Sequence, residues 1–347
     1  MVITRYGASR DELQNLLLNE PRYRVDQVWK GLYTELNAPE DMTALPKALR
    51  AQLVDLLPNS LTLVEEVISD DDTTIKFLWQ LDGGSRIETV LMIYPDRATV
   101  CVSTQAGCAM ACGFCATGQA GFTRHLTAGE IVEQVVRASQ RAKAMDRRVS
   151  NVVYMGMGEP LANEEPVWES IVRLHEDVGL SARHLTVSTV GIIPGINRLA
   201  SRPLPVNLAV SLHAANDNLR DALVPINRRY PIKALMEACN GFLESKNRRL
   251  TFEWALIDGV NDRPSDAIEL AQICRSFRVP AHVNLIPLNP TPGYEVRGSS
   301  RNQVQAFCDQ LVGMGANATI RRNRGTDIAA ACGQLAAGQP VQISRSK

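Results

Sequence analysis

The chain has 347 residues, of which 45% are hydrophobic, and its 37 lysine and arginine residues equal its 37 aspartate and glutamate residues. A net charge of zero gives no overall attraction to a polyanion, so any nucleic-acid contact must come from a local basic patch. No apolar run approaches the roughly 20 residues of a membrane span and the first residues lack a signal peptide's apolar stretch, so we expect a cytoplasmic protein with no membrane partner.

The first part of the chain predicts a small helical unit followed by antiparallel strands. Apolar residues recur at helical spacing in three short segments, namely 11–18, 25–33 and 45–53. Three segments with strand-like alternation follow, at 61–68, 73–81 and 86–93. The turn sequence Asp82-Gly83-Gly84 separates the last two and indicates a hairpin. We therefore expect an N-terminal helical accessory domain over 1–60 and a β connector over 61–96.

From residue 97 to 347, strand-like runs alternate with helical ones and predict a larger core domain. The strand-like runs are 98–104, 151–155, 184–189, 206–212, 249–256, 282–286 and 318–322. A capping box formed by Thr127 and Glu130 starts one of the helices between them. Such alternation implies a parallel sheet with right-handed crossovers. Because six or seven strands cannot complete an eight-stranded barrel, we expect an α/β fold with an open, partial (β/α)6-type barrel, whose ligands lie at the carboxyl ends of the strands.

Three cysteines lie close together, at Cys108, Cys112 and Cys115. A structural zinc ion usually takes four ligands, often as two separated pairs. A four-iron cluster held by three thiolates instead keeps one iron open for a substrate. The spacing therefore favours a cluster, although a distant fourth ligand, Cys101 or one of the five histidines, would still allow zinc.

Three glycines surround these cysteines, Gly107, Gly113 and Gly118, and would allow the positive-φ backbone of a tight cluster-binding loop. The motif and its glycines resemble the signature of the radical S-adenosylmethionine (SAM) superfamily. This resemblance implies a [4Fe-4S] cluster whose open iron binds the amino and carboxylate groups of SAM.

Polar side chains follow several predicted strands and would meet at one edge of the sheet. The turn from Gly156 to Pro160 combines glycines with one carboxylate and suits the approach of a cationic ammonium group. Any one of the other residues could simply cap a helix or form a turn, but together they form a polar ring around one mouth. The predicted SAM-binding residues are Gly158, Glu159, Ser188, Ser211, Leu212, His213 and Asn289.

Over nearly its whole length the chain resembles the bacterial RNA adenine-C2 methyltransferase family. The motifs that carry the resemblance are Cys101, the three-cysteine motif, and residues 121–131, 155–161, 210–214 and 324–335. The resemblance implies action on an adenosine in the peptidyl-transferase centre of 23S rRNA and, as in many members, on the adenosine just 3′ of the tRNA anticodon. It also implies an electron donor such as flavodoxin or ferredoxin. Basic residues of the accessory domain, Arg22, Arg24 and Lys30, could contact RNA phosphates.

The resemblance also implies a mechanism. Carbon 2 of adenine is electron-poor and cannot attack the methyl group of SAM directly. In the family, one SAM methylates the residue at Cys332, and a second SAM provides the radical that activates this methyl group. The activated carbon adds to carbon 2 and links the enzyme to the RNA. Family positions make Glu88 the proton acceptor and Cys101 the resolving thiol, which ends in a disulfide with Cys332.

Taken alone, these last three residues have simpler interpretations. Cys332 lies in a run of small residues, where a buried helical cysteine would be the default. Glu88 alternates with its neighbours as on a solvated strand face, and Cys101 lies between valines as in a core. Three further cysteines in apolar helical patterns are predicted to be core residues: Cys239, Cys274 and Cys308.

Two other functions stay open at this point. A related family methylates carbon 8 of the same rRNA adenosine and shares the cluster motif and the cysteine pair. Pro160, and Ala106 where that group is expected to have a cysteine, favour carbon 2. The other alternative is a non-catalytic RNA-binding protein stabilised by zinc or a cluster, which leaves the pair Cys101 and Cys332 unexplained.

Overall fold

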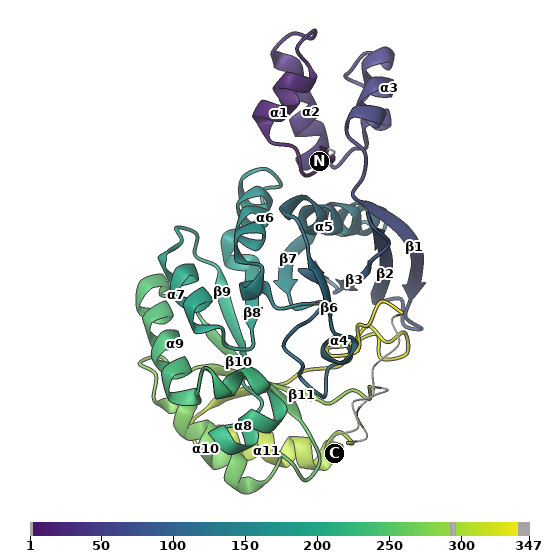
Figure 1. Ribbon diagram of the computed structural model, residues 1–347. Helices are drawn as coiled ribbons and strands as arrows, with labels where there is room; N and C mark the ends of the chain where they lie inside the picture. Colours follow the sequence, from purple (N-terminus) through teal and green to yellow (C-terminus); the bar gives the residue numbers. More distant parts are fainter. Residues whose placement is uncertain (1–2, 292–293, 295, 339–347) are drawn as a thin grey trace.

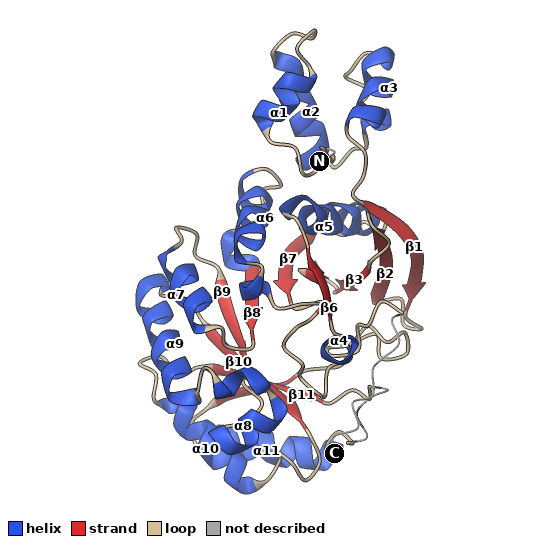
Figure 2. Cartoon of the chain, viewed as in Figure 1, coloured by secondary structure: helices blue, strands red, loops and turns tan. Residues whose placement is uncertain are grey.

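The computed structural model describes residues 3–291, 294 and 296–338. Three short helices form the N-terminal unit at the top of Figure 1: α1 (Arg10–Leu16), α2 (Tyr23–Tyr33) and α3 (Lys47–Leu56). Trp29 on α2 donates to Asp177 and joins this unit to the rest of the chain. Ser9 and Glu12 form a capping box that starts α1. The rest of the described chain folds around one curved sheet, as Figure 2 shows. The three predicted N-terminal helices are thus present, within a few residues of their expected ends.

Ten strands form this sheet, in the order β1-β2-β3-β4-β7-β8-β9-β10-β11-β12. Three antiparallel strands stand at one side: β1 (Leu61–Ile68), β2 (Thr74–Leu81) and β3 (Arg86–Ile93). The parallel strands are β4 (Ala98–Cys101), β7 (Val149–Tyr154), β8 (Leu185–Thr189), β9 (Asn207–Ser211), β10 (Leu250–Leu256), β11 (His282–Pro287) and β12 (Asn317–Ile320). Because β3 pairs antiparallel with β4, opposing Val90 to Cys101, the connector strands continue the core sheet.

Helices cover the outside of the curved sheet, as Figure 1 shows. They are α5 (Ala128–Lys143), α6 (Glu164–Glu176), α7 (Ile193–Ser201), α9 (Ile232–Lys246), α10 (Pro264–Arg275) and α11 (Arg301–Gly313). The short helix α8 (Asp217–Leu223) lies past the carboxyl ends of β8 and β9, where Arg220 donates to the carbonyls of Val190 and Leu212. The predicted capping box at the start of α5 is present, since Thr127 Oγ1 accepts from the Glu130 amide and Glu130 accepts from the Thr127 amide. Short 3-10 turns complete the connections: Pro39–Asp41, Pro160–Ala162, Ala182–His184 and Pro225–Arg228.

The chain between β4 and α5 contains the three-cysteine motif. It comprises β5 (Gln105–Gly107), α4 (Ala116–Ala120) and β6 (Phe122–His125), with β5 and β6 paired antiparallel. The strand expected over 98–104 therefore ends early, at Cys101. The next residues leave the regular ladder to enter this loop, although the Val102 amide still donates to the Val153 carbonyl at 3.0 Å.

The fold class predicted from the sequence is confirmed: seven parallel strands form an open α/β sheet that does not close within the described residues. Its core lies between the sheet and the outer helices, where Trp254 and Phe252 are fully buried. Cys239, Cys274 and Cys308 are buried on α9, α10 and α11, as expected for core residues. No helix in the described ranges is both long and apolar enough to span a bilayer.

Candidate active site

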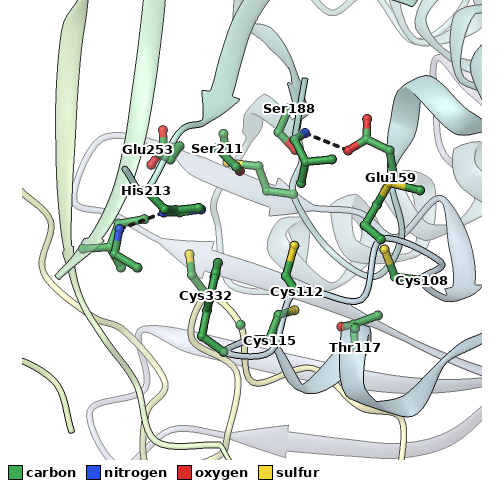
Figure 3. Close-up of a pocket in the computed structure, with 18 of the residues that line it drawn as sticks. Cys108, Cys112, Cys115, Thr117, Glu159, Ser188, Ser211, His213, Glu253 and Cys332 are labelled. Carbon is green, nitrogen blue, oxygen red and sulfur yellow. Dashed lines mark hydrogen bonds between the residues drawn. The ribbon is translucent and has the colours of Figure 1, made fainter. Parts of the chain in front are cut away.

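A cavity of about 160 Å³ opens at the carboxyl ends of the parallel strands, where ligands bind in folds of this kind. Most of the predicted functional residues meet there, and Figure 3 shows several of them around the same space. The predicted residues that line the cavity are Cys108, Cys112, Cys115, Gly158, Glu159, Ser188, Ser211, His213, Asn289 and Cys332. Three predicted residues are not part of its lining: Glu88, Cys101 and Leu212.

The three-cysteine loop depends on close backbone approaches that only glycine allows. Gly107 has φ +76°, and a Cβ there would collide with the carbonyl oxygen of Gly121. The Cys108 amide donates to that same oxygen at 2.7 Å. Gly118 also leaves no room, since a Cβ would lie 2.8 Å from the Cys112 carbonyl oxygen. The expectation of positive φ is confirmed for Gly107 but was wrong for Gly118, which is needed for packing instead.

Gly113 also lacks a positive φ, so that expectation was wrong here too. A Cβ on Gly113 would make only ordinary contact, at 3.5 Å, with the ring of Tyr294. Nothing in the described structure demands glycine at this position.

The donor set fits a cluster. Burial, with a smaller contribution from neighbouring thiolates, raises the pKa of the Cys108 thiol to about 12 and that of Cys112 well above its usual value. Thiolates here therefore require a cationic centre to offset their charge. Among the described residues, no three or more His, Cys, Asp or Glu side chains are placed to hold one ion in common. Separate irons of a cluster suit thiolates that are further apart, so Cys108, Cys112 and Cys115 are the residues that would hold it.

Glu159 places a buried carboxylate on another wall of the cavity (Figure 3). Its oxygens accept from the amides of Leu161 at 3.0 Å and Val190 at 2.9 Å. Burial nevertheless raises the pKa of Glu159 to about 7. Gly158 before it has φ +101°, and a Cβ there would lie 2.6 Å from the Gln105 side chain. A cationic ammonium group in the cavity would favour the ionised carboxylate.

Two serines of the predicted set lie at strand ends beside this carboxylate. Ser188, on β8, donates its hydroxyl to the Tyr154 carbonyl at 2.7 Å and therefore keeps acceptor capacity toward the cavity. Ser211 ends β9 and also lines the cavity. Leu212, the next residue, is fully buried behind the wall.

His213 is held in one orientation and one protonation state. Its ring Nδ1 accepts from the Ala255 amide at 3.0 Å, so the ring hydrogen must be on Nε2. Burial lowers the pKa of His213 to about 3, and the ring packs edge-to-face on Phe114 with centroids 4.8 Å apart. Its backbone has φ +59°, which is uncommon outside glycine. The residue thus presents a neutral imidazole to the cavity.

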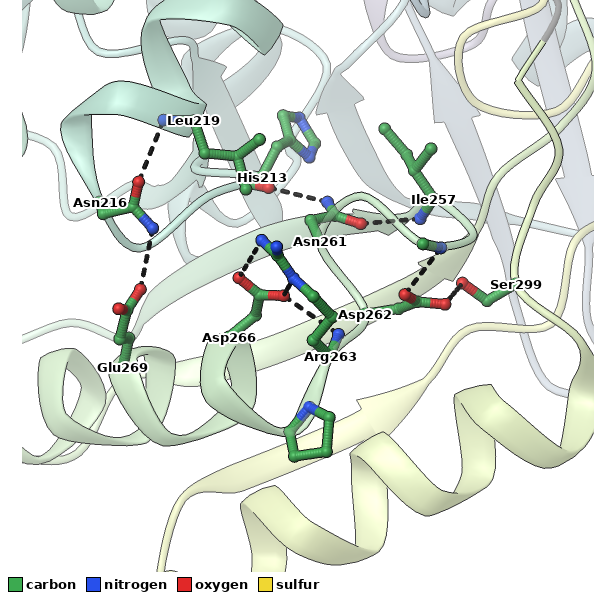
Figure 4. A network of polar contacts seen from close by, with 12 residues as sticks. His213, Asn216, Leu219, Ile257, Asn261, Asp262, Arg263, Asp266, Glu269 and Ser299 are labelled. Carbon is green, nitrogen blue, oxygen red and sulfur yellow. Dashed lines mark hydrogen bonds and ion pairs between the residues drawn. The ribbon is translucent and has the colours of Figure 1, made fainter.

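Asn261 holds the backbone that gives His213 this geometry (Figure 4). Its side-chain amide donates to the carbonyl oxygens of His213 at 2.8 Å and Ala255 at 2.7 Å, and its oxygen accepts from the Ile257 amide at 2.7 Å. Sequence reasoning missed this residue. The only signal was its place after β10 among turn-forming residues, Asp258 to Asp262, and that composition predicts a turn without naming its partners.

Cys332 lies in a turn with its side chain exposed to the cavity, so the default of a buried helical cysteine does not hold. Its carbonyl oxygen accepts from Asn289 Nδ2 at 3.1 Å, and Asn289 Oδ1 accepts from Asn323 at 2.6 Å. The Gly333 carbonyl oxygen accepts from the Ala116 amide at 2.8 Å. Asn289 thus orients the backbone of Cys332 while also lining the cavity.

Cys101 and Cys332 are unbonded thiols. Burial, with a smaller contribution from the nearby Cys332 thiolate, raises the pKa of Cys101 to about 12. Although the Cys332 side chain opens onto the cavity, desolvation by the surrounding protein walls also raises its pKa. The Arg321 guanidinium opposes both shifts.

Glu88 lies on β3, buried, and its carboxylate is already bound. Oε2 accepts from the amides of Ala336 at 2.9 Å and Ala337 at 3.0 Å, and Oε1 lies 3.1 Å from Lys76 Nζ. The sequence alone favoured a solvent-exposed position for Glu88, and that prediction is wrong because the side chain is buried. The described structure thus gives the carboxylate three donors from the protein itself.

Glu253 is a cavity residue that sequence reasoning missed. It is buried on β10, its Oε1 accepts from Asn284 at 2.8 Å, and Oε2 lies 3.6 Å from the Arg321 guanidinium. Burial raises its pKa. A carboxylate in the strand 250–256, whose other residues are apolar except for Thr251, was the available signal, since such a charge is buried only with a partner or a function.

Comparisons with known proteins agree with this geometry. Residues 102–271 match the radical SAM superfamily. A Chloroflexus aurantiacus protein named "probable dual-specificity RNA methyltransferase RlmN" is 48% identical over 98% of this chain and 94% of its own. A Salinispora tropica protein of the same name is 50% identical over 93% and 89%. The crystal structure of a radical SAM methyltransferase from Sphaerobacter thermophilus superposes with a TM-score of 0.92, at 50% identity over 96% of this chain and 99% of that one.

Proposed function

The chain belongs to the RlmN family of radical SAM RNA methyltransferases, and we propose that it methylates carbon 2 of adenosine. The proposed substrates are 23S rRNA, at an adenosine of the peptidyl-transferase centre, and tRNA, at the adenosine 3′ of the anticodon. The relatives' shared description as dual-specificity enzymes supports two RNA substrates. Carbon 2 rather than carbon 8 is supported by Ala106 and Pro160, as argued from the sequence.

One observation carries the proposal: an exposed thiol, Cys332, faces the same cavity as the three cysteines that fit a cluster. A methyltransferase that moves a methyl group straight from SAM to a nucleophile needs no intermediate sulfur. Carbon 2 of adenine is not a nucleophile, so the methyl group must first be placed where it can be activated. A cysteine sulfur beside the cluster meets this requirement.

In the first step, the Cys332 sulfur loses its proton, takes the methyl group of one SAM, and S-adenosylhomocysteine leaves. Glu159, Ser188, Ser211, His213 and the backbone at Gly158 are the proposed SAM-binding groups, with Asn289 orienting the Cys332 backbone. Of these, the Glu159 carboxylate suits the ammonium group of SAM.

A [4Fe-4S] cluster on Cys108, Cys112 and Cys115 supplies, when bound and reduced, the electron that cleaves a second SAM and so the carbon radical that removes hydrogen from the methyl group. The carbon left on the Cys332 sulfur bonds to carbon 2, and the RNA becomes linked to the protein. Release requires loss of one electron, which would return to the cluster that was oxidised when the second SAM was cleaved, and loss of the carbon-2 proton, which Glu88 is proposed to accept.

The Cys101 sulfur then attacks the Cys332 sulfur, and the bond between the Cys332 sulfur and the new methyl carbon breaks. The electron pair of that bond stays on the carbon, which takes a proton to become a methyl group. The two sulfurs are left as a disulfide, which two electrons and two protons return to thiols. A donor such as flavodoxin or ferredoxin would supply these electrons and the electron that reduces the cluster.

Mass spectrometry of nucleosides from a deletion strain tests this proposal. We expect 2-methyladenosine to disappear from both 23S rRNA and tRNA and to return when the wild-type gene is supplied. Loss of 8-methyladenosine instead would move the reaction to carbon 8. Unchanged methyladenosines in both RNAs would reject the proposed function.

A further inference from the structure

The loop that carries Cys332 is fastened at both ends to one ion pair. We define the carrier loop as residues 329–337. Before Cys332, the Ala329 carbonyl oxygen accepts from Lys76 Nζ at 3.3 Å. After it, the amides of Ala336 and Ala337 donate to Glu88 Oε2 at 2.9 and 3.0 Å. In Figure 1 this yellow segment lies beside the ends of β1 and β2.

Strand register explains why these two side chains meet. On the antiparallel pair β2 and β3, Lys76 is opposite Val90 and Glu88 is opposite Leu78. Residues two positions apart on a strand share a face, so Lys76 and Glu88 are diagonal neighbours on one face of the sheet. Their side chains are only 14% and 7% exposed, and Lys76 Nζ lies 3.1 Å from Glu88 Oε1. The ion pair is therefore largely shielded from water and is not an ordinary surface pair.

The middle of the carrier loop is fastened by other elements. Asn289 donates to the Cys332 carbonyl, and Thr117 on α4 donates its hydroxyl to the Leu335 carbonyl at 2.6 Å. Nearly all these bonds go to loop backbone atoms, and several loop side chains are alanines. With little side-chain surface of its own to bury, the loop depends on such polar bonds for its position.

We propose that Lys76 and Glu88 form a clasp that positions the carrier loop, and that opening this clasp is what frees the Glu88 carboxylate to accept a proton. Lys76 is a positioning residue: it fixes Glu88 and bonds to the loop through one ammonium group. While Ala336 and Ala337 occupy Glu88 Oε2, that oxygen is not available to a substrate. The inference rests on the proposed function only in taking Cys332 as methyl carrier and Glu88 as proton acceptor.

Hydrogen–deuterium exchange of the holoenzyme without RNA, read on peptides covering the carrier loop, tests the clasp. Lys76→Met removes the donor to Ala329 and the partner of Glu88, so we expect loop amides to exchange about 10- to 100-fold faster, as for loss of bonds to a charged group. Lys76→Arg keeps a donor and should restore protection. Lys143→Met is the matched control, because Lys143 Nζ also donates to a backbone carbonyl, that of Glu35, away from the loop.

A charge swap distinguishes an ion pair that holds the carrier loop in place from one that only stabilises the fold. The double variant Lys76→Glu with Glu88→Lys keeps an ion pair, but it offers an acceptor to the Ala329 carbonyl and a donor to the amides of Ala336 and Ala337. We expect the loop to exchange fast in this variant, even where the melting temperature is close to that of the wild type. Wild-type loop protection in the charge swap or in Lys76→Met would overturn the proposal.

Glu88→Gln distinguishes anchoring from proton transfer. Glutamine can still accept from the amides of Ala336 and Ala337 but cannot take up a proton at pH 7. We expect loop exchange to rise, but by less than in Lys76→Met because Lys76 can still donate to the Ala329 carbonyl. We expect Cys332 to be methylated as in wild type by peptide mass spectrometry, and methyl transfer to RNA to be lost. Full turnover in Glu88→Gln would refute the second half of the proposal. Because loop exchange is read without RNA, failure of the proposed function would leave the exchange results standing.

Discussion

Replacing Asn261 with alanine should damage the proposed SAM site from a position that does not line the cavity. Its side chain is fully buried and makes three hydrogen bonds, two to the carbonyls of His213 and Ala255 and one from the amide of Ile257. Asn261→Ala leaves these buried backbone groups without their partner, at about 1–3 kcal/mol each. Since neighbouring losses are not additive, we expect the free energy of unfolding to fall by about 3–6 kcal/mol.

The same substitution should weaken SAM binding. His213 has φ +59°, a backbone conformation that costs about 1–3 kcal/mol and persists only where surrounding contacts hold it. Without Asn261 the His213 carbonyl is released and the backbone can relax, which turns the imidazole away from the cavity. A loss of about 1.4 kcal/mol corresponds to tenfold weaker binding, so we expect the dissociation constant for SAM to rise at least about tenfold.

Asn216 provides the matched control from the same network (Figure 4). Its side chain caps α8 by accepting from the Leu219 amide at 3.0 Å, and it is only partly buried. Asn216→Ala should cost about 1 kcal/mol, as for loss of a helix cap, and leave SAM binding unchanged. Urea unfolding followed by circular dichroism and anaerobic calorimetry with SAM measure the two effects. If Asn261→Ala is no worse than Asn216→Ala in both assays, the positioning argument for His213 is wrong.

Two further predictions concern the thiols and one buried carboxylate. Cys332→Ala should abolish methyl transfer but keep the absorbance of the cluster. Cys101→Ala should accumulate RNA crosslinked to Cys332, seen as a shifted band on a denaturing gel. Absence of any adduct would count against the resolving role of Cys101. Burial raises the pKa of Glu133 from 4.5 to about 7, so the folded chain holds this proton more tightly and the free energy of unfolding should fall as pH rises from 4.5 to 7. Glu133→Gln should flatten that part of the urea-unfolding profile, and an unchanged slope would show that Glu133 does not titrate there.

The sequence predicted the elements well because their signals are local. Strand alternation located β1 and β3 at their observed bounds, and the capping box at Thr127 located the start of α5. The cavity followed from topology, since polar residues after successive parallel strands must gather at one edge. The strand and helix predictions depend on residues close together in the chain, and the prediction of the cavity depends on a general rule for parallel sheets. None of them requires knowledge of side-chain packing.

What the sequence could not predict are bonds between side chains and distant backbone atoms. Lys76 and Ala329 are 253 positions apart, and Ala329 contributes only its carbonyl oxygen. A backbone acceptor is the same at every residue, so no residue type marks it. The end of β4 at Cys101 was also missed, because the chain enters the cysteine loop there although the next residues, Val102 to Thr104, favour a strand.

The guanidinium of Arg321 stabilises the thiolates of both Cys101 and Cys332, and this affects the order in which the two thiols can react. Arg321 follows β12, and its guanidinium, opposite Glu253, lowers the pKa of both Cys101 and Cys332 against the larger effect of burial. A Cys332 thiolate also raises the pKa of Cys101. A methylated Cys332 is a thioether and carries no charge, so it neither raises the pKa of Cys101 nor competes for Arg321. In the proposed mechanism, methyl transfer to Cys332 would therefore make the Cys101 thiolate easier to form, which is the order that the proposed resolving thiol requires.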